Sequence, residues 1–393
     1  MAAFRANAEK KTRKEFEGYS RIWHEAAQEL EKEITITDRN NSNSNNSSSK
    51  KKKKKKKKKN DDGEDDDEDD DFFTMIEEKE KIAKKALEER QLSSLKNNND
   101  MSNNNNNNNN NSQSFKQLVQ KNGTASDKIA QATVSVAQDP VGNLRNLETL
   151  LELCEKARVK GGKRGAAQAI TALEELFKDV LLPNRKLKYF SDQEFLSKSH
   201  EYPHERKRLM YWFVEDHVKR SYNRFVQSLE ALSKDPLVVL KEKSMKCAYG
   251  LLVSKPEQEL QLLQILTNKL GDPTRKMASN ASHLLLELTV KHPMMKSIVA
   301  REVERFMFRR GVSLKAQYYG AVLLNQMPLS HKNDGPKLAK QLIETYFGLF
   351  QFLYNKNQKN YDNNEDDNDN NNNKSAVGGD GKKKFVRPHP RGG

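Results

Sequence analysis

The sequence predicts an all-α protein built from helix pairs that repeat along the chain. Residues 222–256 match residues 259–293 after a shift of 37 positions. The positions that coincide are Asp235-Pro236 with Asp272-Pro273, Pro256 with Pro293, Phe225 with Leu262, Leu229 with Leu266 and Leu251 with Leu288. A second, fainter step of the same length aligns Leu240, Met277 and Leu314. Two helices in roughly 40 residues are typical of a HEAT/armadillo-like helical solenoid, in which each pair buries its apolar face only by stacking on neighbouring pairs.

Composition divides the chain into three regions. We expect residues 1–114 to be mostly disordered, because runs of Lys, Asp and Asn cannot bury enough apolar surface to offset the entropy lost on ordering. The solenoid is expected at 115–354, and a disordered, Asn-rich and basic tail at 355–393. Apolar and polar residues alternate over no stretch of useful length, so we expect almost no β structure.

Two short helices are predicted in the N-terminal region. Apolar residues recur at helical spacing over 8–34, and this stripe, which contains Trp23, predicts docking onto a partner or onto the solenoid. A second helix is expected over 72–95, where Phe72 and Ile76 begin an apolar pattern. Low-complexity sequence flanks both helices.

The solenoid opens with a helix at 127–137, which Ser126-Asp127 can cap and Asp139-Pro140 ends. A helix containing Leu144 to Cys154 follows, and Gly161-Gly162 separates it from the next one. The remaining helices are expected at 164–181, 204–232, 236–253, 257–270, 273–291, 294–309, 312–326 and 335–354.

The chain has a formal net charge of +15, and its location is informative. Ten lysines at 50–59 are cancelled by ten acidic residues within 61–71, whereas residues 115–354 hold 38 Lys and Arg against 25 Asp and Glu. The basic excess therefore lies in the region that folds. A basic folded surface favours polyanions, with nucleic acid ahead of anionic membrane. The alternative is a Lys-rich helix surface that serves only solvation.

Basic residues gather at the loops and helix starts of the predicted solenoid. The candidate RNA-binding residues are Lys163, Arg164, Arg185, Lys186, Lys188, Arg206, Lys207 and Arg208. Because solenoid loops recur on one edge, we expect them to align into one stripe that neutralises phosphates, with a salt-sensitive affinity and little base specificity. Aromatic residues do not alternate with these cations, as they would in a groove that stacks the bases of a single strand. The alternative interpretation is that the basic residues are scattered over the surface and serve only solubility.

The sequence contains no recognisable catalytic motif, so we predict a non-enzymatic protein without a cofactor. Gly161-Gly162-Lys163 lacks the upstream strand and the spacing of a phosphate-binding loop. No Ser, His and Asp arrangement is recognisable either. His200 and His204 stand four apart, with His217 downstream, but Tyr202-Pro203 disturbs the helical face that a metal site would need. No metal site is therefore expected.

Two further features indicate ordinary packing. Cys154 and Cys247 are too few for a disulfide framework or a Cys-rich zinc site, and their apolar surroundings predict buried free thiols. Tyr211-Trp212-Phe213 continues at helical spacing through Tyr222 and Phe225, which favours core packing over a ligand site.

Targeting signals favour the nucleus. The first residues lack the apolar core of a signal peptide, and no stretch reaches the roughly 20 apolar residues of a membrane span. We therefore expect a soluble protein of a reducing, intracellular compartment. The lysine run at 50–59 and the basic stretch 382–387 can serve as nuclear import signals.

Several blocks of sequence carry a resemblance to a known family. They are Asp179 to Leu187 (DVLLPNRKL), Tyr211 to Asp216 (YWFVED), Phe225 to Glu230, Leu232 to Pro236, Lys255 to Glu259 (KPEQE), Asn268 to Pro273, Ala316 to Tyr319, and Leu324 to Gln326. With these blocks in this order, the chain resembles the CCAAT-binding-factor family of nucleolar complex proteins. The resemblance extends from about Ala125 to Phe352. The resemblance covers nearly all of the predicted solenoid.

The resemblance implies a non-enzymatic nuclear protein, mainly of the nucleolus, that assembles precursors of the large ribosomal subunit. It also implies contact with pre-ribosomal RNA and a heterodimer with a second nucleolar HEAT-type protein. One alternative is a transcription regulator at CCAAT-containing promoters, although the sequence has no helix-turn-helix, zinc finger or basic zipper. Another alternative is a nuclear solenoid adaptor that binds protein cargo.

The chain also departs from this family. Family members are similar in carrying a second helical region after the segment that corresponds to 335–354. This chain instead continues into Asn-rich sequence and a basic tail. We therefore expect a fragment, a truncated gene model or a short paralogue that lacks part of the partner interface.

Overall fold

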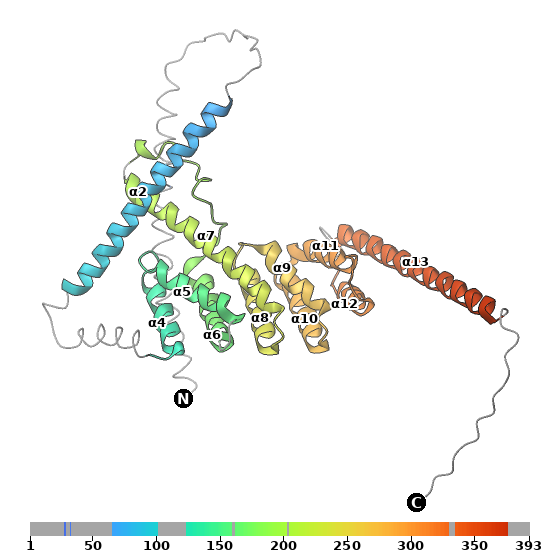
Figure 1. The fold of residues 1–393 in the computed structure, drawn as a ribbon. Coiled ribbons are helices and arrows are strands. Elements are labelled where there is room, and N and C mark those ends of the chain that lie inside the picture. Colours follow the sequence, from blue (N-terminus) through green and yellow to red (C-terminus); the bar gives the residue numbers. More distant parts are fainter. Residues whose placement is uncertain are drawn as a thin grey trace, which may run out of the picture. The chain divides into compact units, whose positions relative to one another are not determined.

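The computed structural model describes residues 27–28, 32, 65–100, 123–158, 162–202, 204–329 and 335–375. In these ranges every regular element is a helix and none is a strand (Figure 1). The predicted all-α helical solenoid is thus confirmed. The chain divides into two compact units, Met1–Pro293 and Met294–Gly393, and each is described by itself. Most of the expected helix 8–34, the lysine run 50–59 and the basic stretch 382–387 lie outside the described residues.

The solenoid helices of the first unit begin and end close to the predicted positions. After α2 (Asp65–Asp100) they are α4 (Ala125–Gln138), α5 (Leu144–Glu155), α6 (Gly162–Glu175), α7 (Glu205–Ser233), α8 (Val238–Ser254), α9 (Glu259–Asn268) and α10 (Arg275–Lys291). A π-helical turn, Leu176–Leu181, prolongs α6 and ends before Pro183. Apolar spacing together with Pro and Gly positions was therefore sufficient to locate these helices.

The sequence repeat is also a structural repeat. A shift of 37 residues carries α8 onto α10 with the same bounds, and it carries residues 222–231 of α7 onto α9. The turn before each second helix is built in the same way. The Asp235 carboxylate accepts the Leu237 N–H at 2.8 Å. The Asp272 carboxylate accepts the Thr274 N–H at 3.0 Å, which again fixes the start of a helix.

Lysine side chains connect these two turn aspartates to the preceding helices. Lys163 of α6 places its Nζ 3.0 Å from Asp235 Oδ1. Lys241 of α8 places its Nζ 3.3 Å from Asp272 Oδ2. Each helix pair is therefore joined to its neighbour by an ion pair as well as by apolar stacking.

The core of the first unit is aromatic where α7 meets the end of α6. The ring of Phe177 lies 5.0 Å from that of Tyr222 and 5.4 Å from that of Phe225, and all three are fully buried. Cys154 and Cys247 are buried free thiols, as the sequence predicts. Burial raises the pKa of the Cys154 thiol to about 12, so this thiol stays protonated and unreactive at neutral pH.

Helix α2 crosses α7 and packs on its N-terminal half (Figure 1). An apolar cluster joins the two helices to the segment between α6 and α7, and it contains Ala83, Phe190, Leu196, Tyr202, Leu209 and Trp212. The Lys79 ammonium, buried beside this cluster, lies 3.4 Å from Glu205 and donates to the hydroxyl of Ser199. The aromatic run Tyr211-Trp212-Phe213 thus contributes to packing, as its spacing predicts. Its packing partner is the N-terminal helix α2.

The first solenoid helix is capped by a different residue from the one predicted. Thr124, rather than Ser126 or Asp127, is the N-cap of α4. The Thr124 hydroxyl accepts the Asp127 N–H at 3.3 Å, and the Asp127 carboxylate accepts the Thr124 N–H at 3.0 Å. This reciprocal pair of hydrogen bonds is a capping box. The sequence Thr-Ala-Ser-Asp has the spacing that predicts it.

The second unit contains α11 (Lys296–Met307), α12 (Leu314–Asn325) and α13 (Gly335–Ser375). Helices α11 and α12 approach closely at Gly320, where an added Cβ would lie 2.6 Å from Met307 Cγ. Helix α13 continues past the predicted end at residue 354, to Ser375.

Candidate nucleic-acid interface

A buried carboxylate holds the irregular segment between α6 and α7. Glu215 of α7 is 1% exposed and accepts two hydrogen bonds from the Arg185 guanidinium, at 2.5 and 3.1 Å. It also accepts the Lys188 N–H at 3.0 Å. The Gln193 amide donates a fourth, longer hydrogen bond at 3.5 Å. A buried carboxylate held by a bidentate arginine loses stability when one of these partners is removed. Arg185 therefore fixes the fold of this segment.

A second buried carboxylate holds the same segment from the other side. Glu257, which precedes α9, accepts the Leu187 N–H at 2.8 Å and lies 3.4 Å from the Lys219 ammonium. The Lys255 ammonium donates to the Asn184 side-chain oxygen at 3.1 Å. Three of the blocks that carry the family resemblance, DVLLPNRKL, YWFVED and KPEQE, therefore meet around one segment.

Arg208 does not belong to the candidate RNA-binding surface. It is 1% exposed, and its guanidinium donates to the Ser199 carbonyl at 2.7 Å. The same guanidinium lies over the rings of Tyr202 and Trp212, at 5.4 and 5.8 Å from their centroids. A side chain with this burial cannot reach a phosphate on the surface. The prediction that Arg208 binds RNA is therefore corrected.

Four other candidates are accessible along the first half of α7 and the segment beside it. Lys186 pairs with Glu259 at 3.3 Å, and Lys188 pairs with Glu194 at 2.6 Å. Arg206 pairs with Glu89 of α2 at 2.9 Å. Lys207 is exposed and has no ion pair within the described residues. We call these four residues (Lys186, Lys188, Arg206 and Lys207) the α7 basic cluster.

The exposed ion pairs of the α7 basic cluster do not exclude a phosphate ligand. The side chain of Lys186 is 70% exposed and that of Arg206 is 58% exposed. Exposed pairs of this kind contribute at most about 1 kcal/mol and are screened by salt, so a phosphate can replace the carboxylate. Arg206 and Glu215, which binds the Lys188 N–H, are nine residues apart on α7, or about 14 Å along the helix.

Lys163 and Arg164 lie at the other end of α7. Lys163 pairs with Asp235, just after the C-terminus of α7, whereas Arg206 lies in its first turn. The 29 residues of α7 span roughly 43 Å. The structure therefore does not bring these two residues into one stripe with Arg206, because they lie near the opposite end of α7.

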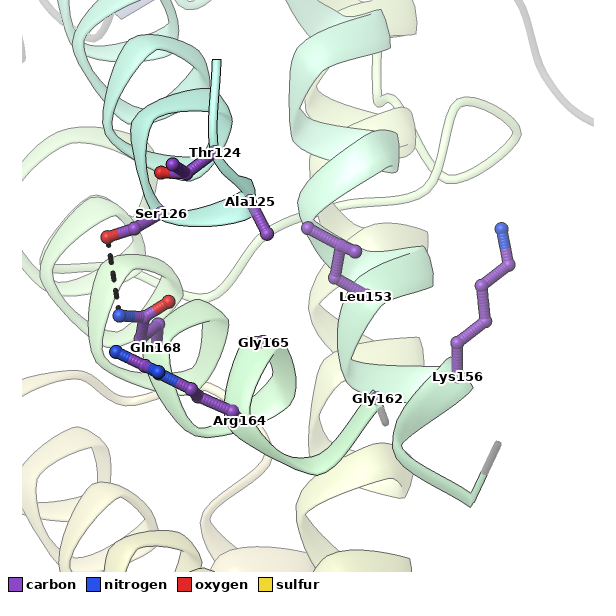
Figure 2. A pocket seen from close by; sticks show the side chains of 9 residues that line it. All are labelled: Thr124, Ala125, Ser126, Leu153, Lys156, Gly162, Arg164, Gly165 and Gln168. Carbon is purple, nitrogen blue, oxygen red and sulfur yellow. Dashed lines mark hydrogen bonds between the residues drawn. The ribbon is translucent and has the colours of Figure 1, made fainter. Parts of the chain in front are cut away.

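Arg164 lines a pocket of about 460 Å³ between the start of α4 and the start of α6. Figure 2 shows Arg164 and Gln168 on one side of the pocket and Lys156 on the other. The Gln168 amide donates to the Ser126 hydroxyl at 3.3 Å, and Lys156 pairs with Glu152 at 2.7 Å. Arg164 is thus the basic group of this pocket that is exposed and has no ion pair in the described chain.

The histidines considered as metal ligands do not converge. Over the described ranges no three His, Cys, Asp or Glu side chains are placed to hold a metal ion. His204 occupies the N-cap of α7 with a φ of 62°, and His217 faces Glu148 at 3.5 Å. A separate result concerns membranes: none of the helices in the described part of the chain is both long and apolar enough to cross one.

Comparison with known proteins tests the resemblance seen in the sequence. No family model matches the chain. Human CCAAT/enhancer-binding protein zeta is 41% identical over 251 residues, which are 62% of this chain and 23% of the human protein. Ribosome biogenesis protein NOC1 of Chaetomium thermophilum is 36% identical over 259 residues (61% and 24%), and nucleolar complex protein 1 of Drosophila melanogaster is 33% identical over 251 residues (62% and 21%). The chain thus resembles proteins of the CCAAT-binding-factor family over its solenoid.

The relationship covers only part of these proteins. The chain spans only about a quarter of the length of the curated relatives it matches. The sequence blocks that carry the resemblance include the buried carboxylates Glu215 and Glu257. The sequence reasoning missed their role. Acidic residues inside otherwise apolar helical blocks, as in YWFVED, are the signal that could have found it.

Proposed function

We propose that this chain is a non-enzymatic assembly factor for the large ribosomal subunit and that its solenoid binds pre-ribosomal RNA. Its relatives include proteins named for ribosome biogenesis and for a nucleolar complex, which supports this role. A nuclear, mainly nucleolar location agrees with the same names. The observation that carries the proposal is the α7 basic cluster, whose exposed cations gather beside one long helix.

Binding would be led by phosphates. Each Lys or Arg of the cluster neutralises one backbone phosphate and releases condensed counterions, so affinity falls steeply with salt. Stacking on bases contributes little, because the large aromatic rings nearby, such as those of Tyr211 and Trp212, are buried in the fold. A heterodimer with a second HEAT-type protein belongs to the same proposal.

We expect Lys186→Gln, Arg206→Gln and Lys207→Gln together to weaken binding of a pre-ribosomal RNA fragment. Three lost phosphate contacts reduce the slope of log affinity against log salt by about 2 to 3 units. Fluorescence anisotropy at several salt concentrations measures both quantities. The matched control removes the same charges from the exposed Lys246, Arg275 and Lys276. Equal losses in the two variants would show that net charge, and not this cluster, binds the RNA.

The name of the human relative favours a second candidate function, that of a regulator at CCAAT-containing promoters. A competition experiment separates the two functions. Phosphate-led binding predicts that a CCAAT duplex and a scrambled duplex of equal length compete equally well. A clear preference for the CCAAT duplex would favour the promoter function over RNA binding.

A further inference from the structure

The pocket of about 460 Å³ between the start of α4 and the start of α6 lies outside the α7 basic cluster. We call it the α4–α6 pocket. Its size falls within the range of about 300–1,000 Å³ that is usual for sites holding a small organic group. The described residues that line it include Lys156 and Arg164 but no acidic residue. The pocket therefore suits a ligand that is negatively charged and larger than a single ion.

One wall of the α4–α6 pocket is a glycine that packing does not explain. Gly165 lies in the first turn of α6, and a Cβ added there would meet no described atom outside its own helical turn within 4 Å. Glycine in a helix is less favourable than alanine by up to about 1 kcal/mol. The missing side chain keeps this wall open, as the close approach of a ligand would require.

The polar side chains of the pocket supply one unpaired cation and neutral hydrogen-bonding groups. Arg164 is exposed and has no ion pair within the described residues, whereas Lys156 shares an exposed pair with Glu152. Gln168 follows Arg164 by four residues, so both lie on one face of α6 (Figure 2). The Gln168 amide donates to the Ser126 hydroxyl at 3.3 Å. Its carbonyl oxygen remains able to accept a hydrogen bond from a ligand.

The pocket also has an apolar wall. In Figure 2 the Leu153 side chain of α5 is turned toward Ala125 at the start of α4. An apolar wall can lie against the face of a nucleobase while a nearby amide bonds the edge of the base. The closest acidic residue in the sequence of α4, Asp127, is engaged by its own helix. Its carboxylate accepts the Thr124 N–H at 3.0 Å and the Thr124 hydroxyl at 2.7 Å.

We propose that the α4–α6 pocket holds one unpaired nucleotide of a single-stranded RNA. The Arg164 guanidinium binds the phosphate, and Gln168 bonds the edge of a base that lies against Leu153. A phosphodiester carries one negative charge, which one unpaired cation matches. A phosphoserine carries a charge of about −1.5 to −2, is normally held by several arginines and would leave the apolar wall uncovered. The choice of RNA rests on the proposed function, but the site and its residues are separate from the α7 basic cluster.

The test measures binding of a fluorescein-labelled uridine hexanucleotide to the full chain by fluorescence anisotropy. Gly165→Leu fills the pocket and raises helix propensity, so the fold should be retained. Arg164→Gln removes the phosphate contact. We expect each change to weaken binding by about 10-fold. The controls are Gly165→Ala, which leaves most of the space open, and Arg145→Gln, which removes an exposed arginine of α5 outside the pocket. Both controls should bind almost as the original chain does.

Two further measurements separate this site from other modes of binding. The first repeats the series in a chain that also carries Lys186→Gln, Arg206→Gln and Lys207→Gln. The effect of Gly165→Leu should persist there, because the pocket does not depend on the α7 basic cluster, so the two proposals fail separately. The second uses an abasic ribose-phosphate hexamer, which should bind more weakly than the uridine hexamer because it leaves the apolar wall uncovered.

Several results would overturn the proposal. One is unchanged binding after Gly165→Leu in a chain whose helicity, measured by circular dichroism, is also unchanged. Another is an equal loss from Arg164→Gln and Arg145→Gln, which would mean that only net charge matters. A third is a phosphoserine hexapeptide that binds the original chain more tightly than the RNA does and loses this binding on Gly165→Leu. That result would assign the pocket to a phosphorylated protein.

Discussion

Arg185 and Lys186 are neighbours in the sequence, but their carboxylate partners differ in burial. Glu215 is 1% exposed, whereas the side chain of Glu259 is 42% exposed. Removing one member of a buried pair leaves an uncompensated charge and costs about 3 kcal/mol or more, while an exposed pair contributes less than about 1 kcal/mol. We therefore expect Arg185→Met to lower the free energy of unfolding by about 3 kcal/mol and Lys186→Met to change it little. Urea denaturation measures both, and equal effects would contradict the assignment of Arg185 to folding.

Arg208 and Lys207 show how far single residues could be predicted. Both belong to a basic run, and charge alone gives no reason to separate them. The helical period does separate them in part, because Arg208 is four residues before the buried Trp212 and so shares its face of α7. The partners of Arg208, a backbone carbonyl and two rings, depend on tertiary contacts that no local pattern contains.

At the scale of elements, the docking of α2 on α7 can be tested. Ala83 is fully buried in their common cluster, whereas its neighbour Ile82 is 38% exposed. We expect Ala83→Glu to release α2 from α7. Burying an unpaired carboxylate among apolar side chains is costly, so the helix would move away and leave the carboxylate in water. Limited trypsin digestion should then cleave at Lys84 and Lys85 much faster. Ile82→Glu is the control, and similar cleavage in both variants would argue against this docking.

Helix positions were predictable, but the contacts between distant elements were only partly so. Repeated apolar positions and Asp-Pro pairs locate α7 to α10, because each of these helices packs on its sequence neighbours. Helix α2 reaches α7 across a low-complexity linker, which contains no information about register. For the candidate site, the sequence could not reveal that Arg208 is buried or which carboxylates pair with the other cations.

At the scale of the whole solenoid, the turn aspartates join successive repeats and give stability a pH dependence. Burial acts to raise the pKa of Asp272, but the Thr274 N–H and the Lys269 ammonium outweigh it and hold the pKa below its ordinary value. The Leu237 N–H chiefly lowers the pKa of Asp235 as well. An unfolded chain therefore takes up these protons first as the pH falls. The stability that the two carboxylates contribute is complete above the ordinary aspartate pKa, about 3.9, and is lost below it.

Asp272→Asn isolates this contribution, because the amide oxygen can still accept the Thr274 N–H but the side chain cannot carry charge. We expect the variant to be less stable than the original chain at neutral pH. The difference should shrink as the pH falls below about 4, since the unfolded original chain then binds a proton at Asp272 before the folded chain does. Lys241 reaches Asp272 from the preceding helix pair, so the unfolding transition of the variant should also become less cooperative. Urea unfolding between about pH 6 and pH 3 measures both effects, and a constant difference across that range would mean that the carboxylate charge does not couple the repeats.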